Sequence, residues 1–359
     1  MTALRVDGLF KVFGRYPAGA VERLRAGATA DEIRASGATP AVIDVDLAVE
    51  PGEIFVVMGL SGSGKSTLLR MLNGLLEPTA GTVTVGGDEI TALSGKRLRE
   101  VRQRRISMVF QHLALLPHRS VVDNAAYALE VRGVERRTRL AAAREALSMV
   151  GLDGQADKRP DQLSGGMQQR VGLARALASE AEVLLMDEAF SALDPLIRRE
   201  MQDQLLELQA RLGKTIVFIT HDLNEAMRLG DRIAIMRDGR IVRLGTPESI
   251  LADPGDEYVE RFLADVDRAR VFTAADVAVP TASPDVPPAG RVPADTPLTE
   301  LLGPVSASEA PIAVVDDAGR TIGLVDARAV LAALAGRPSD DRAAAPLADR
   351  AGLLEGSRG

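Results

Sequence analysis

The sequence contains no cysteine and no tryptophan, and aromatic side chains make up only 3% of its 359 residues. A chain without cysteine forms no disulfide, which fits a reducing compartment. Its apolar runs stay well below the roughly eighteen uncharged residues that a membrane-spanning helix needs, and its N-terminus lacks the apolar core of a signal peptide. We therefore expect no membrane span and no secretory leader.

Basic charge is also in short supply, because 43 Lys and Arg residues face 50 Asp and Glu residues and the net charge is −7. Nucleic-acid binding usually needs a basic face, so we expect no nucleic-acid partner. Two Arg-rich clusters, at 99–105 and 132–139, are interpreted as solvated helix faces. The length suits a domain of about 250 residues followed by an appendage.

The strongest positive signal is a glycine-rich loop, Gly59 to Ser66, with the spacing G-x-x-x-x-G-K-S. An apolar run at 54–58 precedes it and a helical pattern at 67–72 follows, so the loop ends a strand and opens a helix whose dipole attracts anions. Backbone N–H groups of such a loop surround phosphates, while its Lys reaches the β- and γ-phosphate oxygens and its Ser ligates Mg²⁺. This predicts ATP and Mg²⁺ as ligands, with contacts from Gly59, Ser61, Gly62, Gly64, Lys65, Ser66 and Thr67.

Two carboxylates follow another apolar run, at 183–186. Ligands of open α/β sheets bind at the carboxyl ends of the strands, where Asp187 and Glu188 would then lie. We expect Asp187 to hold Mg²⁺, and Glu188 to orient or deprotonate the water that attacks the γ-phosphate. An ordinary buried strand with an acidic turn is the alternative, which the upstream phosphate loop makes less favourable.

Polar side chains end two further apolar runs, with Gln111 after 106–110 and His221 after 215–220. The chain has only three histidines, and a lone histidine is more often structural than catalytic. The place of His221 at a strand end, on the same edge as Asp187, favours a catalytic role. Gln111 has the same geometry and is expected to contact Mg²⁺ or the water through its amide.

The order of these motifs is more specific than any one of them. The phosphate loop, Gln111, Leu163-Ser164-Gly165-Gly166, Asp187-Glu188, Ser191-Ala192-Leu193-Asp194 and His221 follow one another along the chain. In this order the chain resembles the nucleotide-binding subunit of an ATP-binding cassette (ABC) transporter over roughly residues 4 to 265. The resemblance implies an α/β P-loop NTPase fold, with a mixed sheet core in a domain of residues 1–265 and a helical subdomain at about 112–165.

The resemblance also implies a homodimer in which two subunits pair head to tail. ATP held by the 59–67 loop of one subunit is then closed over by Ser164, Gly165 and Gly166 of the other, and Asp194 lies at the seam. Backbone amides at the start of a helix suit this role, because they form an anion-binding site.

The chain departs from the family pattern at Met167, where the family usually has Gln. We expect hydrolysis to survive, since backbone amides supply most of the contacts. An aromatic residue of the N-terminal segment is expected to stack on adenine. Phe13 matches that position best, and Phe10 is assigned to the core.

An extra segment at 14–37, with helical composition at 20–36, separates two predicted N-terminal strands. Together with the loop sequences it resembles the ATPase subunit of glycine betaine/proline (quaternary amine) importers. Such a subunit works with transmembrane permease subunits, indirectly with an extracytoplasmic solute-binding protein, and lies on the cytoplasmic face of the bacterial cell membrane. The helical part of 122–150 and the loop at 113–121 are expected to receive the permease, with Leu115, Leu116 and Pro117 in the groove.

Other functions stay open at this point. One is an ABC importer for another small solute such as an amino acid, and another is a soluble, non-transport ABC ATPase. The second usually carries a long coiled coil between the two loops, for which this chain has no room. A P-loop kinase would need no Leu-Ser-Gly-Gly loop.

The C-terminal part is predicted to form a separate α+β unit. Residues 298–336 have a helix-strand-strand-helix order that resembles one cystathionine-β-synthase (CBS) type motif, which normally occurs in pairs. Residues 266–297, rich in Pro, Ala and Asp near their end, are expected to be a linker or a decayed first copy. Residues 337–359 are expected to be disordered.

Overall fold

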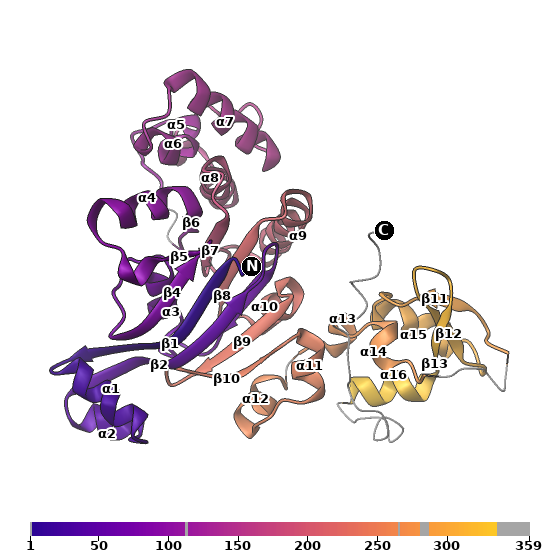
Figure 1. Ribbon diagram of the computed structural model, residues 1–359. Coiled ribbons are helices and arrows are strands. Elements are labelled where there is room, and N and C mark those ends of the chain that lie inside the picture. Colours follow the sequence, from indigo (N-terminus) through magenta and orange to yellow (C-terminus); the bar gives the residue numbers. More distant parts are fainter. Residues whose placement is uncertain (1, 112–113, 265, 281–286, 336–359) are drawn as a thin grey trace, which may run out of the picture. The chain divides into compact units, whose positions relative to one another are not determined.

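The computed structural model describes residues 2–111, 114–264, 266–280 and 287–335, which divide between two compact units (Figure 1). The larger unit comprises Met1–Ile250 and Gly255–Arg261. The smaller unit comprises Leu251–Pro254 and Phe262–Gly359. None of the helices in the described ranges is both long and apolar enough to cross a bilayer.

A six-stranded sheet in the larger unit carries the predicted motifs at its strand ends. Its order is β10-β9-β3-β8-β7-β6, and all neighbours are parallel except the hairpin β9–β10. The central strands are continuous apolar runs because both faces of the sheet are covered. The strands are β3 (Ile54–Met58), β6 (Ile106–Val109), β7 (Val183–Asp187), β8 (Thr215–Thr220), β9 (Arg232–Arg237) and β10 (Arg240–Gly245).

A second, antiparallel sheet has the order β2-β1-β4-β5. Residues of both sheets, such as Val6 and Val57, share one buried cluster with Leu68 of helix α3 (Lys65–Leu72). The phosphate loop therefore rests on the main core of the unit. The strands are β1 (Leu4–Gly14), β2 (Ala38–Val49), β4 (Ala80–Val85) and β5 (Asp88–Glu89).

Helices make up the rest of the larger unit, and α5, α6 and α7 gather with one end of α8 away from the strands (Figure 1). Helices α5, α6 and α7 fall within the predicted helical subdomain, of which 112–113 lie outside the described residues, and α8 begins at its predicted end. Helices α11 and α12 lie where the chain passes between the two units. The elements are η1 (Ile90–Ala92), α4 (Gly95–Arg105), α5 (Val121–Ala125), α6 (Tyr127–Val131), α7 (Arg136–Met149), η2 (Pro160–Gln162), α8 (Gly165–Ala178), α9 (Pro195–Leu212), α10 (Leu223–Leu229), α11 (Pro247–Ala252) and α12 (Glu257–Phe262).

The extra N-terminal segment is helical, as predicted, and consists of α1 (Pro17–Arg25) and α2 (Ala30–Ala35). A capping box starts α2, in which the Thr29 hydroxyl accepts from Glu32 N and the Glu32 carboxylate accepts from Thr29 N. Helix α1 packs on β1 and α2 packs on β2, and both contribute to a separate cluster that contains Phe10 and Ile33, each almost fully buried. Phe10 is thus a core residue, as assigned.

The smaller unit includes the described part of the segment for which a linker or a decayed first copy was expected. Residues 266–280 and 287–297 supply α13, α14 and β11 to the same unit as the predicted motif. Strand β11 pairs in parallel with β12, which pairs antiparallel with β13. The elements are α13 (Arg268–Val271), α14 (Ala274–Val277), β11 (Arg291–Pro293), α15 (Leu298–Ser306), β12 (Ile312–Val315), β13 (Thr321–Val325) and α16 (Ala327–Leu334).

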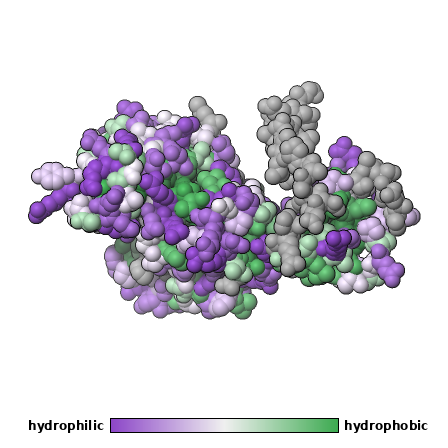
Figure 2. Space-filling view, turned by 90° about the horizontal axis from the view of Figure 1, so that it is seen from below, coloured by the Kyte–Doolittle hydropathy of each residue, from purple (hydrophilic) through white to green (hydrophobic). Residues whose placement is uncertain are grey.

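The predicted disordered tail, 337–359, lies outside the described residues. On the face drawn in Figure 2, hydrophilic side chains cover most of the larger unit and hydrophobic side chains gather in a smaller area. This distribution fits the apolar side chains being buried in the two clusters of that unit.

Removing most of the Ile33 side chain should destabilise the extra segment. Ile33 has no exposed surface, so Ile33→Ala is expected to cost about 2 to 4 kcal/mol of unfolding free energy. The measurement is urea unfolding followed by far-UV circular dichroism. Asp31→Asn on the same helix, where the side chain is 88% exposed, should change stability by less than about 0.5 kcal/mol. Equal effects of the two substitutions would contradict the packing of α2.

Candidate functional site

The phosphate loop joins the end of β3 to the start of α3, as the spacing predicts. Gly59 (φ 151°) and Gly64 (φ 105°) have backbone conformations that favour glycine. A Cβ atom at Gly59 would collide with the Met236 carbonyl, and one at Gly64 with the Ala41 carbonyl. Both glycines are therefore needed for the close approach of the loop to β2 and β9.

Lys65 is almost fully buried beneath the loop, with 5% of its surface exposed. Its ammonium donates to the carbonyls of Gly59 (2.8 Å) and Leu60 (3.0 Å). Burial lowers the pKa of Lys65, while the charges of Glu188 and Asp187 oppose that shift. The ammonium is thus held at the loop, where it can exchange its hydrogen bonds to backbone carbonyls for hydrogen bonds to phosphate oxygens.

The three predicted catalytic side chains come together at the edge of the sheet. Glu188 Oε2 lies 3.1 Å from His221 Nδ1 and accepts a hydrogen bond from Gln111 Nε2 at 3.2 Å. They follow β7, β8 and β6 respectively, three neighbouring parallel strands. The Glu188 side chain is 19% exposed and that of His221 is 57% exposed, so the cluster opens to solvent on the histidine side.

Glu188 has a strained backbone, with a φ of 46° in the left-handed region that favours glycine. Its N–H donates to the Ile219 carbonyl of the next strand at 3.0 Å. Its own carbonyl accepts from Ser191 N (3.2 Å) and Ser191 Oγ (2.9 Å). Such strain persists where surrounding contacts fix it, and it often marks a functional position.

Asp187 lies next to the phosphate loop, where the Ser66 hydroxyl donates to its carboxylate at 3.4 Å. Burial raises the pKa of Asp187, and the neighbouring Glu188 charge adds to the effect. A carboxylate and a hydroxyl are hard oxygen donors of the kind that Mg²⁺ prefers together with substrate phosphates. Gln111, the third expected ligand, contacts Glu188 in this structure.

The Leu-Ser-Gly-Gly loop and Asp194 are exposed helix starts. Ser164 caps α8 by accepting from Met167 N (3.4 Å), and Asp194 caps α9 by accepting from Ile197 N (3.1 Å). A Cβ atom at Gly166 would lie 2.8 Å from the Ile197 side chain, so the two helix starts are neighbours. Within the described part of the chain, no hydrogen bond joins either of them to the phosphate loop.

Phe13 lies in β1 with 42% of its surface exposed, and Lys11 Nζ lies 5.2 Å from the centre of its ring. It pairs with Thr39 of β2, two residues from Ala41, whose carbonyl lies against Gly64. The ring is therefore accessible and close in the sheet to the phosphate loop. This position is compatible with the predicted stacking on adenine.

Gln169 is a site residue that the sequence did not reveal. It lies on α8 with 4% of its surface exposed, and its side-chain amide donates to the carbonyl of Ala189, directly after Glu188. The helix that follows the Leu-Ser-Gly-Gly loop is thereby tied to the acidic turn. Its only sequence signal is a polar residue at a helix position that faces the core.

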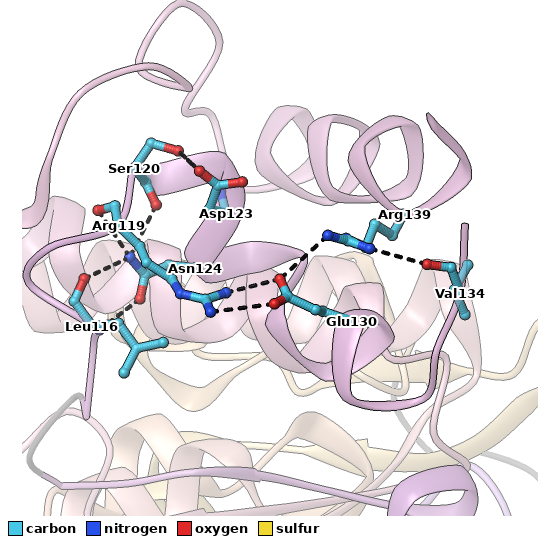
Figure 3. A network of polar contacts seen from close by, with 8 residues as sticks. All are labelled: Leu116, Arg119, Ser120, Asp123, Asn124, Glu130, Val134 and Arg139. Carbon is cyan, nitrogen blue, oxygen red and sulfur yellow. Dashed lines mark hydrogen bonds and ion pairs between the residues drawn. The ribbon is translucent and has the colours of Figure 1, made fainter. Parts of the chain in front are cut away.

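Asn124, which is fully buried, anchors the loop at 114–120 (Figure 3). Asn124 Oδ1 accepts from Leu116 N at 2.7 Å, and its amide nitrogen donates to the Leu116 carbonyl at 3.1 Å. Arg119 forms a two-pronged ion pair with Glu130 of α6, at 2.8 Å and 3.2 Å. These contacts give the loop a fixed shape on the helical subdomain.

A phosphate loop beside an acidic strand end, with a carboxylate, an amide and an imidazole in contact, defines a P-loop ATPase. The family model for "ABC transporter" matches residues 42–191. The glycine betaine transport ATP-binding protein OpuAA of Bacillus subtilis is 47% identical over 93% of this chain and 92% of its own length. This chain belongs to the family of ABC transporter ATP-binding proteins, and it binds and hydrolyses ATP.

Other relatives and solved structures agree. The glycine betaine/proline betaine transport system ATP-binding protein ProV of Escherichia coli is 53% identical over 77% of this chain and 69% of its own length. The dimeric structure of MJ0796, a bacterial ABC transporter cassette, matches with a TM-score of 0.57 and 31% identity, over 68% of this chain and 98% of that one. The resemblance seen in the sequence motifs and the predicted fold class are thus confirmed.

Replacing Glu188 by Gln should nearly stop turnover while ATP still binds. The change removes the negative charge that would orient or deprotonate water, a loss on the order of 10² to 10⁴ in rate. Steady-state phosphate release and equilibrium ATP binding measure the two effects separately. Glu182→Gln, at the other end of β7, is the control and should leave the rate unchanged, because Glu182 pairs with Arg105 away from the site. Rapid hydrolysis by the Glu188 variant would remove this residue from the role.

The raised pKa of Asp187 predicts a pH-dependent stability effect. At pH values above the raised folded-state pKa, the ionised Asp187 carboxylate lowers the free energy of unfolding. At pH values below the unfolded-state pKa, Asp187 is protonated in both states and this cost is absent. Asp187→Asn should therefore raise the melting temperature of the nucleotide-free protein at neutral pH. The difference should shrink as the pH falls through the folded-state pKa. Thermal unfolding across a pH series tests this, and a gain that grows at low pH would contradict it.

Proposed function

We propose that this chain is the ATP-hydrolysing subunit of an importer of glycine betaine, proline or a related quaternary amine. Support comes from the extent of the matches. The glycine betaine/carnitine transport ATP-binding protein GbuA of Listeria monocytogenes is 45% identical over 94% of this chain, and OpuAA matches over 93%. A methionine import ATP-binding protein, MetN 2 of Bacillus licheniformis, reaches a similar 46% identity over only 64%. Sequence identity alone therefore leaves an amino-acid importer as the second candidate. The larger share of this chain that the glycine betaine relatives match favours a quaternary amine importer.

In the proposed mechanism two copies pair head to tail around two ATP molecules. Lys65 and the amides of the phosphate loop bind the phosphates of one ATP, and Phe13 stacks on its adenine. Ser164 and the Gly165 and Gly166 amides of the other copy close over the γ-phosphate. The support is that these helix starts are exposed and lack hydrogen bonds to the phosphate loop of their own chain, among the residues that the structure describes.

Within the closed site the roles follow the contacts. Glu188 orients or deprotonates the attacking water, His221 holds Glu188 and the γ-phosphate in place, and Gln111 donates to the same oxygen of the Glu188 carboxylate that His221 contacts. Ser66 and Asp187, joined by Gln111 on closure, would hold Mg²⁺. When bound, the ion would neutralise phosphate charge.

Membrane attachment is proposed to occur through partners, at the cytoplasmic face of the bacterial membrane. Transmembrane permease subunits would dock on the loop at 114–120 and on α5 to α7. The anchoring of this loop by Asn124 and by the Arg119–Glu130 pair supports that role, because a shaped loop can transmit force without deforming (Figure 3). A solute-binding protein on the other side of the membrane would deliver the substrate.

For the smaller unit we propose a single CBS-type motif that modulates the ATPase. Its elements α15, β12, β13 and α16 follow the helix-strand-strand-helix order expected from the sequence. Strand β11 adds a third strand to the sheet. Because such motifs normally occur in pairs, a second copy from another subunit would complete the pair.

Deleting this chain from its host should abolish uptake of labelled glycine betaine and leave labelled methionine uptake intact. The native chain should restore transport, and Lys65→Ala should fail to restore it because the loop then lacks its phosphate-binding charge. Membrane fractionation of the same cells checks that the variant still attaches through its partners. Loss of methionine uptake in place of betaine uptake would favour the amino-acid importer.

A further inference from the structure

One arginine connects two segments of the site that are far apart in sequence. Arg198 on α9 donates through Nη1 to Asp222 Oδ2 at 3.1 Å. Its Nη2 donates to the carbonyls of Leu193 (3.2 Å) and Ser191 (3.4 Å). A single guanidinium thus contacts the 191–194 loop on one side and the start of α10 on the other.

Both segments carry site residues at their ends. The 191–194 loop runs from Ser191, which donates to the Glu188 carbonyl, to Asp194 at the exposed start of α9. Asp222 directly follows His221, and its other carboxylate oxygen accepts from Glu225 N at 3.1 Å. Arg198 therefore fixes a residue adjacent to His221 and the loop that begins beside Glu188.

Partial burial limits the arrangements that the Arg198 guanidinium can adopt. The Arg198 side chain is 28% exposed, and its Nε is buried without a hydrogen-bond partner. A half-buried guanidinium has a planar, directed set of donors, so it holds its acceptors in one arrangement. An ammonium at the same place could not reach the carboxylate and both carbonyls with the same geometry.

A second, buried link joins the same two helices. Glu225 of α10 accepts from Thr220 Oγ1 (2.6 Å) and from Gln202 Nε2 of α9 (3.1 Å). Burial raises the pKa of Glu225. The strand end that carries His221 is thus tied to α9 behind the Arg198 contact, and the two segments are expected to move as one body.

We propose that Arg198 is a positioning residue that sets His221 according to the state of the 191–194 loop. A partner subunit seated against Asp194 shifts or fixes this loop, and Arg198 passes that placement through Asp222 to His221 and so to Glu188. The proposal rests on the roles proposed above for Asp194 and His221. It explains why a guanidinium that is only 28% exposed has donors directed at three separate acceptors.

The test is the steady-state ATPase of the full chain with Arg198→Met. We expect kcat to fall roughly 10- to 100-fold, as for a small misplacement of a catalytic group, while the equilibrium ATP affinity changes less than about twofold. Arg198→Lys should recover part of the rate, because it keeps the charge beside Asp222. Asp222→Asn should lower kcat as well, and the double variant should lose little more than Arg198→Met alone.

Two control variants separate positioning from stability. Arg228→Met breaks the Arg228–Asp203 pair, which also joins α10 to α9 and has a similarly exposed arginine (29%), but contacts no site segment. Arg199→Met removes an exposed charge next to Arg198. Both should keep the native kcat, even if Arg228→Met lowers the melting temperature as much as Arg198→Met does.

Two outcomes would overturn the proposal. One is a kcat for Arg198→Met equal to that of Arg228→Met, and the other is a lower ATP affinity with unchanged kcat. His221→Ala is measured in parallel. If it keeps full activity, the proposed role of His221 fails. If it loses activity while Arg198→Met does not, the failure belongs to Arg198 alone.

Discussion

The parallel pairing of β6, β7 and β8 is the constraint on which the site depends. In this register Val109 lies beside Met186, and Asp187 lies beside Ile219. Gln111, Glu188 and His221 each follow these positions by one or two residues, so their side chains meet at one edge. A slip of one residue in any of the three strands would turn its side chains to the opposite face and separate the cluster.

The same edge of the sheet brings charged side chains together where they are partly buried. The buried Lys65 ammonium donates hydrogen bonds to two loop carbonyls. The pKa of Asp187 is raised by burial and by the neighbouring Glu188 charge. A triphosphate would exchange these carbonyl contacts for anionic oxygens, and a divalent cation would compensate the two carboxylates. Binding energy from these exchanged contacts can therefore be used to arrange the groups at this edge.

The sequence predicted the parts of the fold that depend on local pattern. Apolar runs predicted the strands that precede Glu188 and His221, and the loop spacing predicted the strand-loop-helix at Lys65. Local pattern left 266–297 open between a linker and a decayed first copy, whereas 266–280 and 287–297 supply short helices and β11 to the smaller unit. Composition alone cannot distinguish such a segment from a linker.

Contacts between distant segments were also beyond the sequence. Nothing in the pattern of α9 identifies Arg198 among the arginines beside it, because its partners Leu193 and Asp222 are brought together only by the crossing of α9 and α10. The left-handed backbone conformation of Glu188 could not be predicted from the sequence either, because it depends on contacts with Ile219 and Ser191 and not on its own residue type.

Ser164 and Asp194 are both exposed at the starts of their helices. Both are capped helix starts with directed N–H groups, and in the described residues both lack a hydrogen bond to the phosphate loop of their own chain. Gly166 packs against Ile197, so the two starts form one continuous surface. A second chain seated there would contact an anion-binding helix start and the 191–194 loop at once, so binding of its nucleotide and the placement of His221 in this chain would be coupled. Cooperativity between the two sites would then follow from the way α8 and α9 begin side by side, without a large rearrangement of either sheet.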